Sequence, residues 1–260
     1  MRLSISRLGT LNRCGMQYHF RYIEGIVAAP GVSAIVGKGT HRANASDLLN
    51  KMDAGELLPL EEVKSIAADA TKCEWQDQPP MLDEDEKAKG EDAVKGEAVD
   101  KSVALVELYH TKLAPTIEPV AIEAQATITL GNGDDLFMIK DLETPTHVRD
   151  TKTSGKSPDA NAADVSLQLT AYLWESSLRG NPKAGALDYL VSTKTPKQVT
   201  LETTRGQADF AALEDRLARA SSTIQSGMFS PCPPDSWACS PKWCGYWSRC
   251  PFGERGRTKR

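Results

Sequence analysis

The 260-residue sequence has no apolar run long enough to cross a membrane, which argues against a membrane-spanning helix. Its N-terminus also lacks the apolar core and the small-residue cleavage site of a secretory signal, so we expect an intracellular protein. Disulfides are rare in that compartment. The formal net charge of −4 gives no overall electrostatic argument for nucleic-acid binding.

The composition is that of a folded protein. The chain contains 40% hydrophobic and 25% charged residues and is long enough to bury a substantial core. Its charge is unevenly distributed: residues 81–101 are acidic, whereas the first 21 residues carry four arginines and residues 249–260 are rich in basic side chains. Such local positive fields can bind phosphates on a protein that is acidic overall, although charged termini are often simply solvated.

Six cysteines are present, and four of them lie within nineteen residues near the C-terminus. Proline, tryptophan and glycine make this segment unsuited to regular helix or strand, so we expect a metal centre to order it. The C-x2-C pairs typical of zinc sites are absent, which favours an iron–sulfur cluster over zinc, with unligated thiols as a third alternative. Cys239, Cys244 and Cys250 would supply three thiolates, and either Cys232 or Cys14 the fourth.

Hydrophobic periodicity predicts a helical N-terminal part followed by strands that alternate with helices. The first helices are expected at 4–24, 33–52, 60–73 and 83–113. A three-stranded antiparallel meander follows, with GNGD (131–134) as a hairpin turn. Beyond it we expect a helix, two strands and a last helix at 163–180, 186–194, 198–204 and 207–227.

Two carboxylates and an ammonium group end neighbouring strands of the predicted meander. Asp141 ends the second strand, and Asp150 and Lys152 end the third, two residues apart and therefore on one face. Two close carboxylates repel each other unless a cation lies between them, and hard oxygen ligands suit Mg²⁺ or Mn²⁺. Such an ion can activate water for attack on a phosphoryl group, while the lysine stabilises the developing charge. A surface ion pair is the simpler interpretation of Asp150 and Lys152 taken alone.

At these residues the chain resembles the PD-(D/E)xK nucleases, particularly the branch of the RecB nuclease domain, Cas4 and the AddB-type iron–sulfur nucleases. The segments that carry the resemblance follow the family's order: LSISRLGTLNRCGMQYHF, GKGTH, MIKDL, RDTKTS, QLTAY and the cysteine-rich tail. The resemblance implies an α/β, restriction-endonuclease-like core, with a central mixed sheet flanked by helices and a cysteine-rich, cluster-bound C-terminal segment. It further implies one nuclease domain with a helical part (1–115), a catalytic core (116–228) and an iron–sulfur segment (229–260) closed by Cys14.

The resemblance also implies roles for individual residues. Asp141 and Asp150 would be metal ligands and Lys152 the catalytic ammonium, with Gln168 and Tyr172 positioning either the substrate or the lysine.

His41, in GKGTH, would ligate the metal or support a ligand, and Gly37 would let its helix approach the site closely. Glu123 would be a further ligand or a plain strand-face acid. The cluster, a [4Fe-4S] centre, would be held by Cys14, Cys239, Cys244 and Cys250, with Cys232 as the alternative ligand. The aromatic side chains of the tail are expected to pack over the cluster in preference to stacking on bases: Trp237, Trp243, Tyr246 and Trp247.

The expected activity is metal-dependent DNA exonuclease cleavage at DNA ends or in single strands, in recombination, repair or CRISPR-type processing. The setting would be the cytoplasm of a bacterium, or of the host if a phage encodes the chain. No G-x-x-x-x-G-K-[ST] motif is present, so unwinding would need a helicase partner, and a single-strand annealing or recombination protein is a second expected partner. The alternatives are a catalytically silent DNA-binding or assembly module of the same fold and a zinc-stabilised structural protein.

Overall fold

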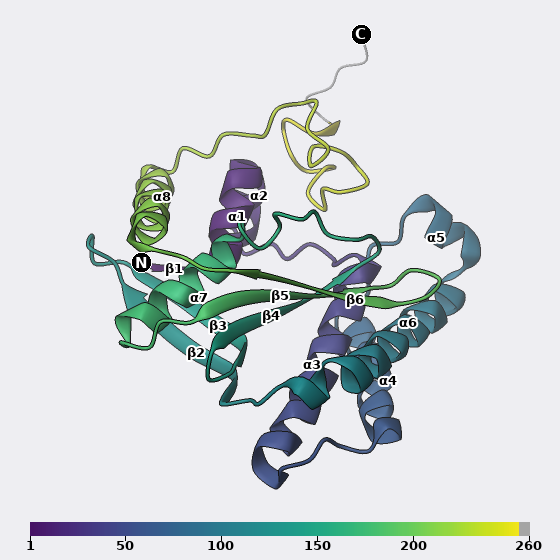
Figure 1. Cartoon of the computed structure of the whole chain (residues 1–260). Coiled ribbons are helices and arrows are strands. Elements are labelled where there is room, and N and C mark those ends of the chain that lie inside the picture. The colour runs from purple at the N-terminus through teal and green to yellow at the C-terminus, as the bar shows by residue number, and fades with distance from the viewer. Residues whose placement is uncertain (255–260) are drawn as a thin grey trace. The chain divides into compact units, whose positions relative to one another are not determined.

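The computed structural model describes residues 1–254 (Figure 1). Residues 255–260, which form part of the predicted basic C-terminal segment, lie outside the described residues. The fold is mixed α/β, with a six-stranded sheet in the order β1-β3-β4-β5-β6 and with β2 paired to β3. Helices flank this mixed sheet, so the predicted fold class is confirmed.

The strands are β1 (Arg2–Leu3), β2 (Ala121–Thr129), β3 (Asp135–Glu143), β4 (His147–Ser154), β5 (Ala184–Val191) and β6 (Lys197–Thr203). The α-helices are α1 (Ile5–Arg13), α2 (Gly15–Tyr18), α3 (Val32–Ala54), α4 (Leu60–Asp77), α5 (Glu84–Lys89), α6 (Glu91–Lys112), α7 (Leu167–Leu178) and α8 (Gln207–Ser226). A π-helical turn, η1 (His19–Ile23), and a 3₁₀ turn, η2 (Ala114–Thr116), complete the described elements.

The chain divides into two compact units. One contains residues 1–29, 127–137 and the chain from 211 onward, and the other contains residues 30–126 and 138–210. The second unit holds β4, β5 and β6, where β4 and β5 run parallel and β5 and β6 antiparallel. The parallel pair is connected through α7, as a parallel crossover requires.

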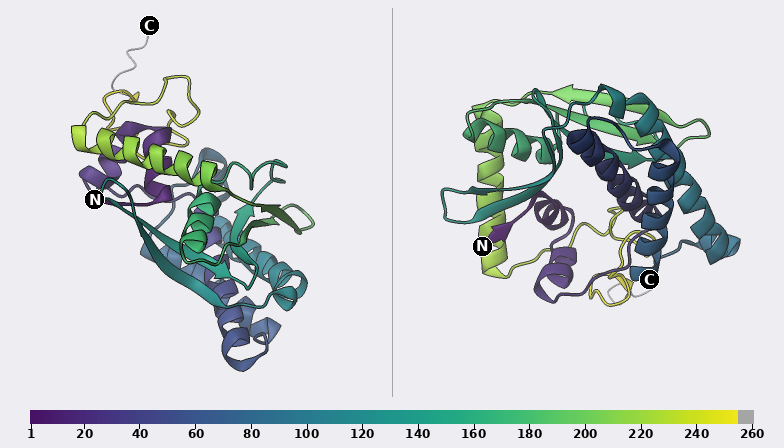
Figure 2. Two further views of the ribbon diagram at one scale, coloured as in Figure 1. Left: turned by 60° about the vertical axis from the view of Figure 1, so that its left-hand side comes forward. Right: turned by 90° about the horizontal axis from the view of Figure 1, so that it is seen from below.

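Helices cover both faces of the sheet in the second unit. Leu190 on β5 belongs to the apolar core that α3 and α6 build with β3, and α3, α4 and α6 pack against one another (Figure 2). A Cβ atom at Gly185, also on β5, would lie 3.2 Å from the Leu173 side chain of α7. Positions 185 and 190 differ by an odd number, so their side chains point to opposite faces of the strand. The sheet is therefore buried from both sides where β4, the strand that carries Asp150, runs beside β5.

Two of the predicted helices are interrupted. The expected helix over 83–113 is divided at Gly90, whose φ of 88° is a left-handed conformation that suits glycine. The expected helix over 4–24 ends at Arg13, because Cys14 adopts an extended backbone with φ −165° before α2 begins. This break turns Cys14 out of the helical pattern and leaves its side chain buried.

The first unit joins the start of the chain to its cysteine-rich tail. β1 pairs in parallel with the beginning of β3, and the N-terminal ammonium contacts the Asp134 carboxylate. The ring of Phe20 stacks on Tyr246, whose hydroxyl donates a hydrogen bond of 2.9 Å to the Ile26 carbonyl. Residues near both ends of the sequence thus share one small apolar core.

Candidate active site and cysteine cluster

The site in the second unit begins with the antiparallel pairing of β3 and β4, in which Leu142 lies opposite Arg149. This register brings the predicted carboxylates of the two strands together. Oδ2 of Asp141 accepts a hydrogen bond of 3.0 Å from the backbone N–H of Thr151. The side chain of Asp150, on the same strand as Thr151, is only 1% exposed.

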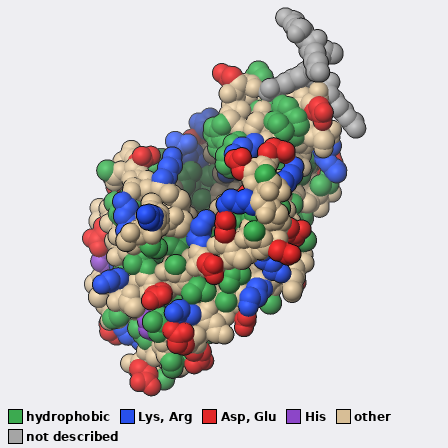
Figure 3. Space-filling view, turned by 90° about the vertical axis from the view of Figure 1, so that its right-hand side faces the viewer, with side chains coloured by type: hydrophobic (Ala, Val, Ile, Leu, Met, Phe, Trp, Pro, Cys, Tyr) green, Lys and Arg blue, Asp and Glu red, His purple; other side chains and the backbone are tan. Residues whose placement is uncertain are grey.

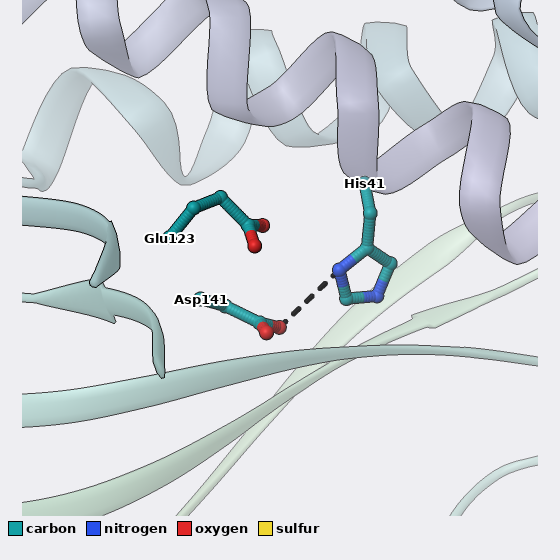
Figure 4. Close-up of side chains that lie close together, drawn as sticks. All are labelled: His41, Glu123 and Asp141. Atoms are coloured by element: carbon teal, nitrogen blue, oxygen red, sulfur yellow. Dashed lines mark ion pairs between the residues drawn. The ribbon is translucent and has the colours of Figure 1, made fainter. Parts of the chain in front are cut away.

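His41 reaches this site from α3. Its Nδ1 atom lies 3.2 Å from Oδ2 of Asp141 (Figure 4). Burial alone would lower the pKa of His41, but the hydrogen bond and the negative charge of Asp141 outweigh it and raise the pKa. A Cβ atom at Gly37, one turn earlier, would lie 3.2 Å from Oγ1 of Thr153 on β4, so glycine permits the close approach of helix and strand.

Glu123 on β2 completes a group of three potential ligands. One ligand atom from each of His41, Glu123 and Asp141 lies within 4.8 Å of the others (Figure 4). The backbone of Glu123 has φ 49°, which is unusual for a residue with a side chain and is found often at functional sites. Burial and the charge of Asp141 raise the pKa of the Glu123 carboxyl. Sequence patterning could not reveal this backbone conformation, because β2 reads as an ordinary alternating strand.

The electrostatics at Asp150 fit a bound cation. Burial, followed by the charge of Asp141, raises its pKa to about 6, and the ammonium of Lys152 offsets this only in part. Lys152 Nζ lies 2.7 Å from Oδ2, yet neither buried oxygen of Asp150 accepts a hydrogen bond of normal geometry from the residues the structure describes. Buried carboxylate oxygens without such partners are costly, and a hard divalent cation would satisfy them.

Lys152 is held from α7 by a short chain of hydrogen bonds. Its Nζ donates to Oε1 of Gln168 at 2.9 Å. Nε2 of Gln168 donates to the Tyr172 hydroxyl at 2.6 Å, which in turn donates to the Ile139 carbonyl of β3 at 2.5 Å. Gln168 and Tyr172 lie one helical turn apart, so both face the sheet. The structure therefore brings together all the residues that the sequence analysis assigned to the catalytic site.

The family description "PD-(D/E)XK nuclease superfamily" matches residues 2–251. The chain belongs to this nuclease superfamily. Nucleases of this superfamily use divalent metals, which agrees with the ligand group around Asp141. No curated protein sequence matches the chain.

A solved structure named "Putative exonuclease" from Eubacterium rectale has the same fold as this PD-(D/E)XK nuclease. Its TM-score is 0.57 at 12% identity, and the match covers 92% of this chain and 86% of the other. A second structure, named SSO0001, covers 94% of both chains at 16% identity, with a TM-score of 0.35. None of the described helices of the nuclease is long and apolar enough to span a bilayer.

A buried ionic network, which sequence reasoning missed, fixes α7 of the nuclease against β3. Lys140 is 3% exposed and lies 2.8 Å from Glu143 and 2.7 Å from Glu175 of α7. Arg179 and Lys183 also contact Glu143, at 2.7 and 2.9 Å. The available signal is a lysine, Lys140, in an otherwise largely buried strand, together with an acid, Glu175, about one helical turn after Tyr172. The network holds the helix that carries Gln168.

Five cysteines of the nuclease line one apolar pocket in the first unit: Cys14, Cys232, Cys239, Cys244 and Cys250. The backbone N–H of Cys232 donates to Sγ of Cys14 at 3.4 Å. Burial, together with nearby Cys14 and Cys239, raises the pKa of Cys232 to about 12, and burial also raises that of Cys244. None of the six cysteines, all within the described residues, forms a disulfide, and Cys73 is exposed on α4.

This donor set fits a thiolate-bound metal centre. The raised pKa values of Cys232 and Cys244 mean that these two thiols stay neutral unless a cation draws off their protons, as metal binding does. The pocket offers one thiol more than either a cluster or a zinc ion requires. Cys14 and Cys232, the two alternatives for the fourth ligand, lie side by side in it.

The aromatic side chains of the tail behave differently from one another. Tyr246 is buried, and Trp247 packs against the apolar core around Phe20. Trp237 and Trp243, however, are 64% and 59% exposed. Tyr246 and Trp247 line the cysteine pocket, whereas Trp237 and Trp243 do not, because the tail turns these two side chains towards solvent.

Proposed function

We propose that this PD-(D/E)XK nuclease is a Mg²⁺- or Mn²⁺-dependent deoxyribonuclease that acts as an exonuclease on DNA ends or single strands. The observation that carries the proposal is the convergence of His41, Glu123 and Asp141, with Asp150 and Lys152 beside them, in one part of the fold. The name of the structural neighbour from Eubacterium rectale supports an exonuclease mode.

The residues present divide the chemistry between them. When bound, the divalent ion would act as a Lewis acid that lowers the pKa of a water molecule and offsets the negative charge of the phosphate. Asp141 and Asp150 would hold the ion, with His41 and Glu123 completing its protein ligands. Lys152 would orient the attacking water and offset charge that develops on the phosphate oxygens. Gln168 accepts a hydrogen bond from the Lys152 ammonium and so directs it towards the site.

We propose further that the chain belongs to the branch that resembles RecB, Cas4 and AddB, and that it binds a [4Fe-4S] cluster. Cys14, Cys239, Cys244 and Cys250 would be the ligands, with Cys232 as the alternative fourth. The five-cysteine pocket supports a thiolate-bound centre. We also propose that the chain is one nuclease domain, in which the cluster joins residues 229–260 to the start of the chain.

The proposed cellular role is recombination, repair or CRISPR-type processing of DNA in a bacterial or phage-infected cytoplasm. A helicase or a single-strand annealing protein would supply the single-stranded substrate. The residues of the described chain could cut the strand but offer no nucleotide-hydrolysing motif of the G-x-x-x-x-G-K-[ST] type to unwind it.

An assay on end-labelled single-stranded and duplex DNA tests the proposal. With Mg²⁺ or Mn²⁺ we expect mononucleotides or short products to appear from one labelled end first, and no cleavage with a chelator present. An Asp141→Ala variant should be inactive with either metal. Internal cuts from the outset would contradict the exonuclease mode, and absent cleavage of any DNA by the wild type would indicate a silent binding module instead.

A further inference from the structure

Two exposed tryptophans form an unusual surface feature in the first unit. Trp237 and Trp243 are 64% and 59% exposed, although large aromatic side chains dominate protein cores and interfaces. Their ring centroids are 6.1 Å apart, and the ring planes meet at 86°. The two rings therefore form an open corner and not a closed stack.

Positive side chains accompany both rings. The Arg13 guanidinium carbon lies 5.9 Å from the centroid of Trp237, and Nζ of Lys242 lies 5.4 Å from that of Trp243. Arg13 is exposed, and among residues 1–254 no carboxylate forms an ion pair with it. The corner thus presents aromatic faces and cations together, which is the chemistry that complements a base and its phosphate.

The chain as a whole offers no net positive charge to a nucleic acid. On the face drawn in Figure 3, basic and acidic side chains are interspersed, and the chain carries a formal net charge of −4. Nucleic-acid binding on such a protein depends on local contacts between aromatic rings, cations and the strand.

We propose that Trp237 and Trp243, with Arg13 and Lys242, form a binding site for single-stranded DNA, in which unpaired bases stack on the indole rings. Because the rings are nearly perpendicular, one base stacks on one ring while its edge contacts the other. Bases in a duplex are already stacked and cannot enter the corner, so the site selects unpaired strands. This inference rests on the proposed function for its ligand, but the site uses none of the residues that would cut the strand.

Binding assays without added divalent metal test this site independently of cleavage. The full-length chain is titrated against a fluorescein-labelled oligodeoxythymidine of about 20 nucleotides and against a duplex of equal length, with anisotropy as the readout. Trp237→Ala and Trp243→Ala should each weaken single-strand binding by about fivefold to about a hundredfold, and duplex binding should change little. Trp237→Phe should restore most of the loss, because it keeps a stacking face.

The matched control is Val27→Ala, which truncates a side chain of the same unit that is also 64% exposed. It should bind as the wild type does. Arg13→Ala should weaken binding and lower the salt dependence of log K by about 0.7, the share of one phosphate contact on a single strand. The tryptophan variants should leave that salt slope unchanged, since stacking releases no counterions.

Single-strand affinity that stays within about twofold of wild type in both Trp→Ala variants would overturn the inference. Equal losses for single strands and duplex would also overturn it, because stacking on unpaired bases predicts a difference. If the wild type cleaves DNA and the variants bind normally, only this inference fails. If the wild type never cleaves but the variants lose single-strand binding, the proposed nuclease activity fails and the binding site stands.

Discussion

Asp150 and Lys152, two residues apart on β4, contact each other: Lys152 Nζ lies 2.7 Å from Oδ2 of Asp150. The carboxylate is buried and the ammonium is partly exposed, so the pair presents one positive group towards solvent above one buried negative group. In an ordinary surface ion pair both partners would be solvated, and their interaction would add little to the stability of the fold. Here the pKa of the buried partner, Asp150, is raised above that of an ordinary aspartate, and a titration can measure the difference.

Metal affinity should depend on pH through Asp150. Its pKa is raised to about 6 in the metal-free protein, so a proton must leave before the carboxylate can bind a cation. Below about pH 6 the apparent affinity for Mn²⁺ should therefore fall by about tenfold per pH unit, as calorimetric titration would show. Asp150→Asn provides the control, because its side chain does not titrate.

The same raised pKa makes the stability of the fold depend on pH, because the folded chain binds a proton at Asp150 more tightly than the unfolded chain does. The contribution of Asp150 to the free energy of unfolding is present below its ordinary pKa of 3.8 and is lost as pH rises towards about 6. Denaturant titrations with a chelator should show this loss in the wild type and not in Asp150→Asn; equal profiles would contradict the assignment.

Tyr172→Phe should slow cleavage without changing substrate affinity. The variant removes the hydroxyl that accepts from Gln168 and donates to the Ile139 carbonyl, so Gln168 no longer holds Lys152 in place. We expect kcat to fall by about tenfold with KM unchanged, as a positioning role requires. Tyr109→Phe, which removes a similarly buried hydroxyl, is the matched control. Additive losses in Tyr172→Phe and Gln168→Ala would argue against a shared role.

The cysteine pocket predicts a coloured, iron-containing protein. Prepared without oxygen, the wild type should carry about four iron atoms per chain. Cys14→Ser should lose most of this iron, whereas Cys73→Ser, which alters an exposed thiol outside the pocket, should keep it. Iron loss in Cys232→Ser with none in Cys14→Ser would assign the fourth ligand to Cys232. A colourless protein that contains zinc would contradict the iron–sulfur proposal.

Glu143→Gln should destabilise the fold by about 3 kcal/mol at neutral pH, because Lys140 and Lys183 would then lose a buried counter-charge. Burial alone would raise the pKa of Glu143, but hydrogen bonds from Lys140, Arg179 and Lys183 lower it to about 2. Its contribution to stability is therefore present above the ordinary pKa of 4.5 and is lost as pH falls towards about 2. Denaturant unfolding measures both effects, with the exposed Glu118→Gln as control. A change no larger than that control would contradict the network's role.

The sequence predicted the elements of the site where local pattern and chemistry agree. Local signals are strong for the turn at GNGD, the strand that carries Asp150 and the helix that carries Gln168. In the structure the turn connects β2 to β3, the strand is β4 and the helix is α7. The ends of these elements differ by a few residues from the prediction, because helix and strand termini depend on packing and capping.

Features set by tertiary contacts could not be predicted in this way. β1 is two residues long and exists through its pairing with β3, and the break at Cys14 interrupts an otherwise helical pattern. The left-handed backbone of Glu123 has no signature in an alternating strand. The exposure of Trp237 likewise follows from the path of an irregular tail, which no periodicity describes.

The most direct test of the account is the rate of DNA cleavage in a single turnover with saturating Mn²⁺, compared between the wild type, Lys152→Ala and Lys72→Ala. Lys72 is an exposed lysine on α4 in the same unit. We expect Lys152→Ala to lose at least about a hundredfold in rate, since it removes the group that offsets charge at the phosphate, and Lys72→Ala to cleave as the wild type does. Equal rates in all three proteins would contradict the catalytic role of Lys152.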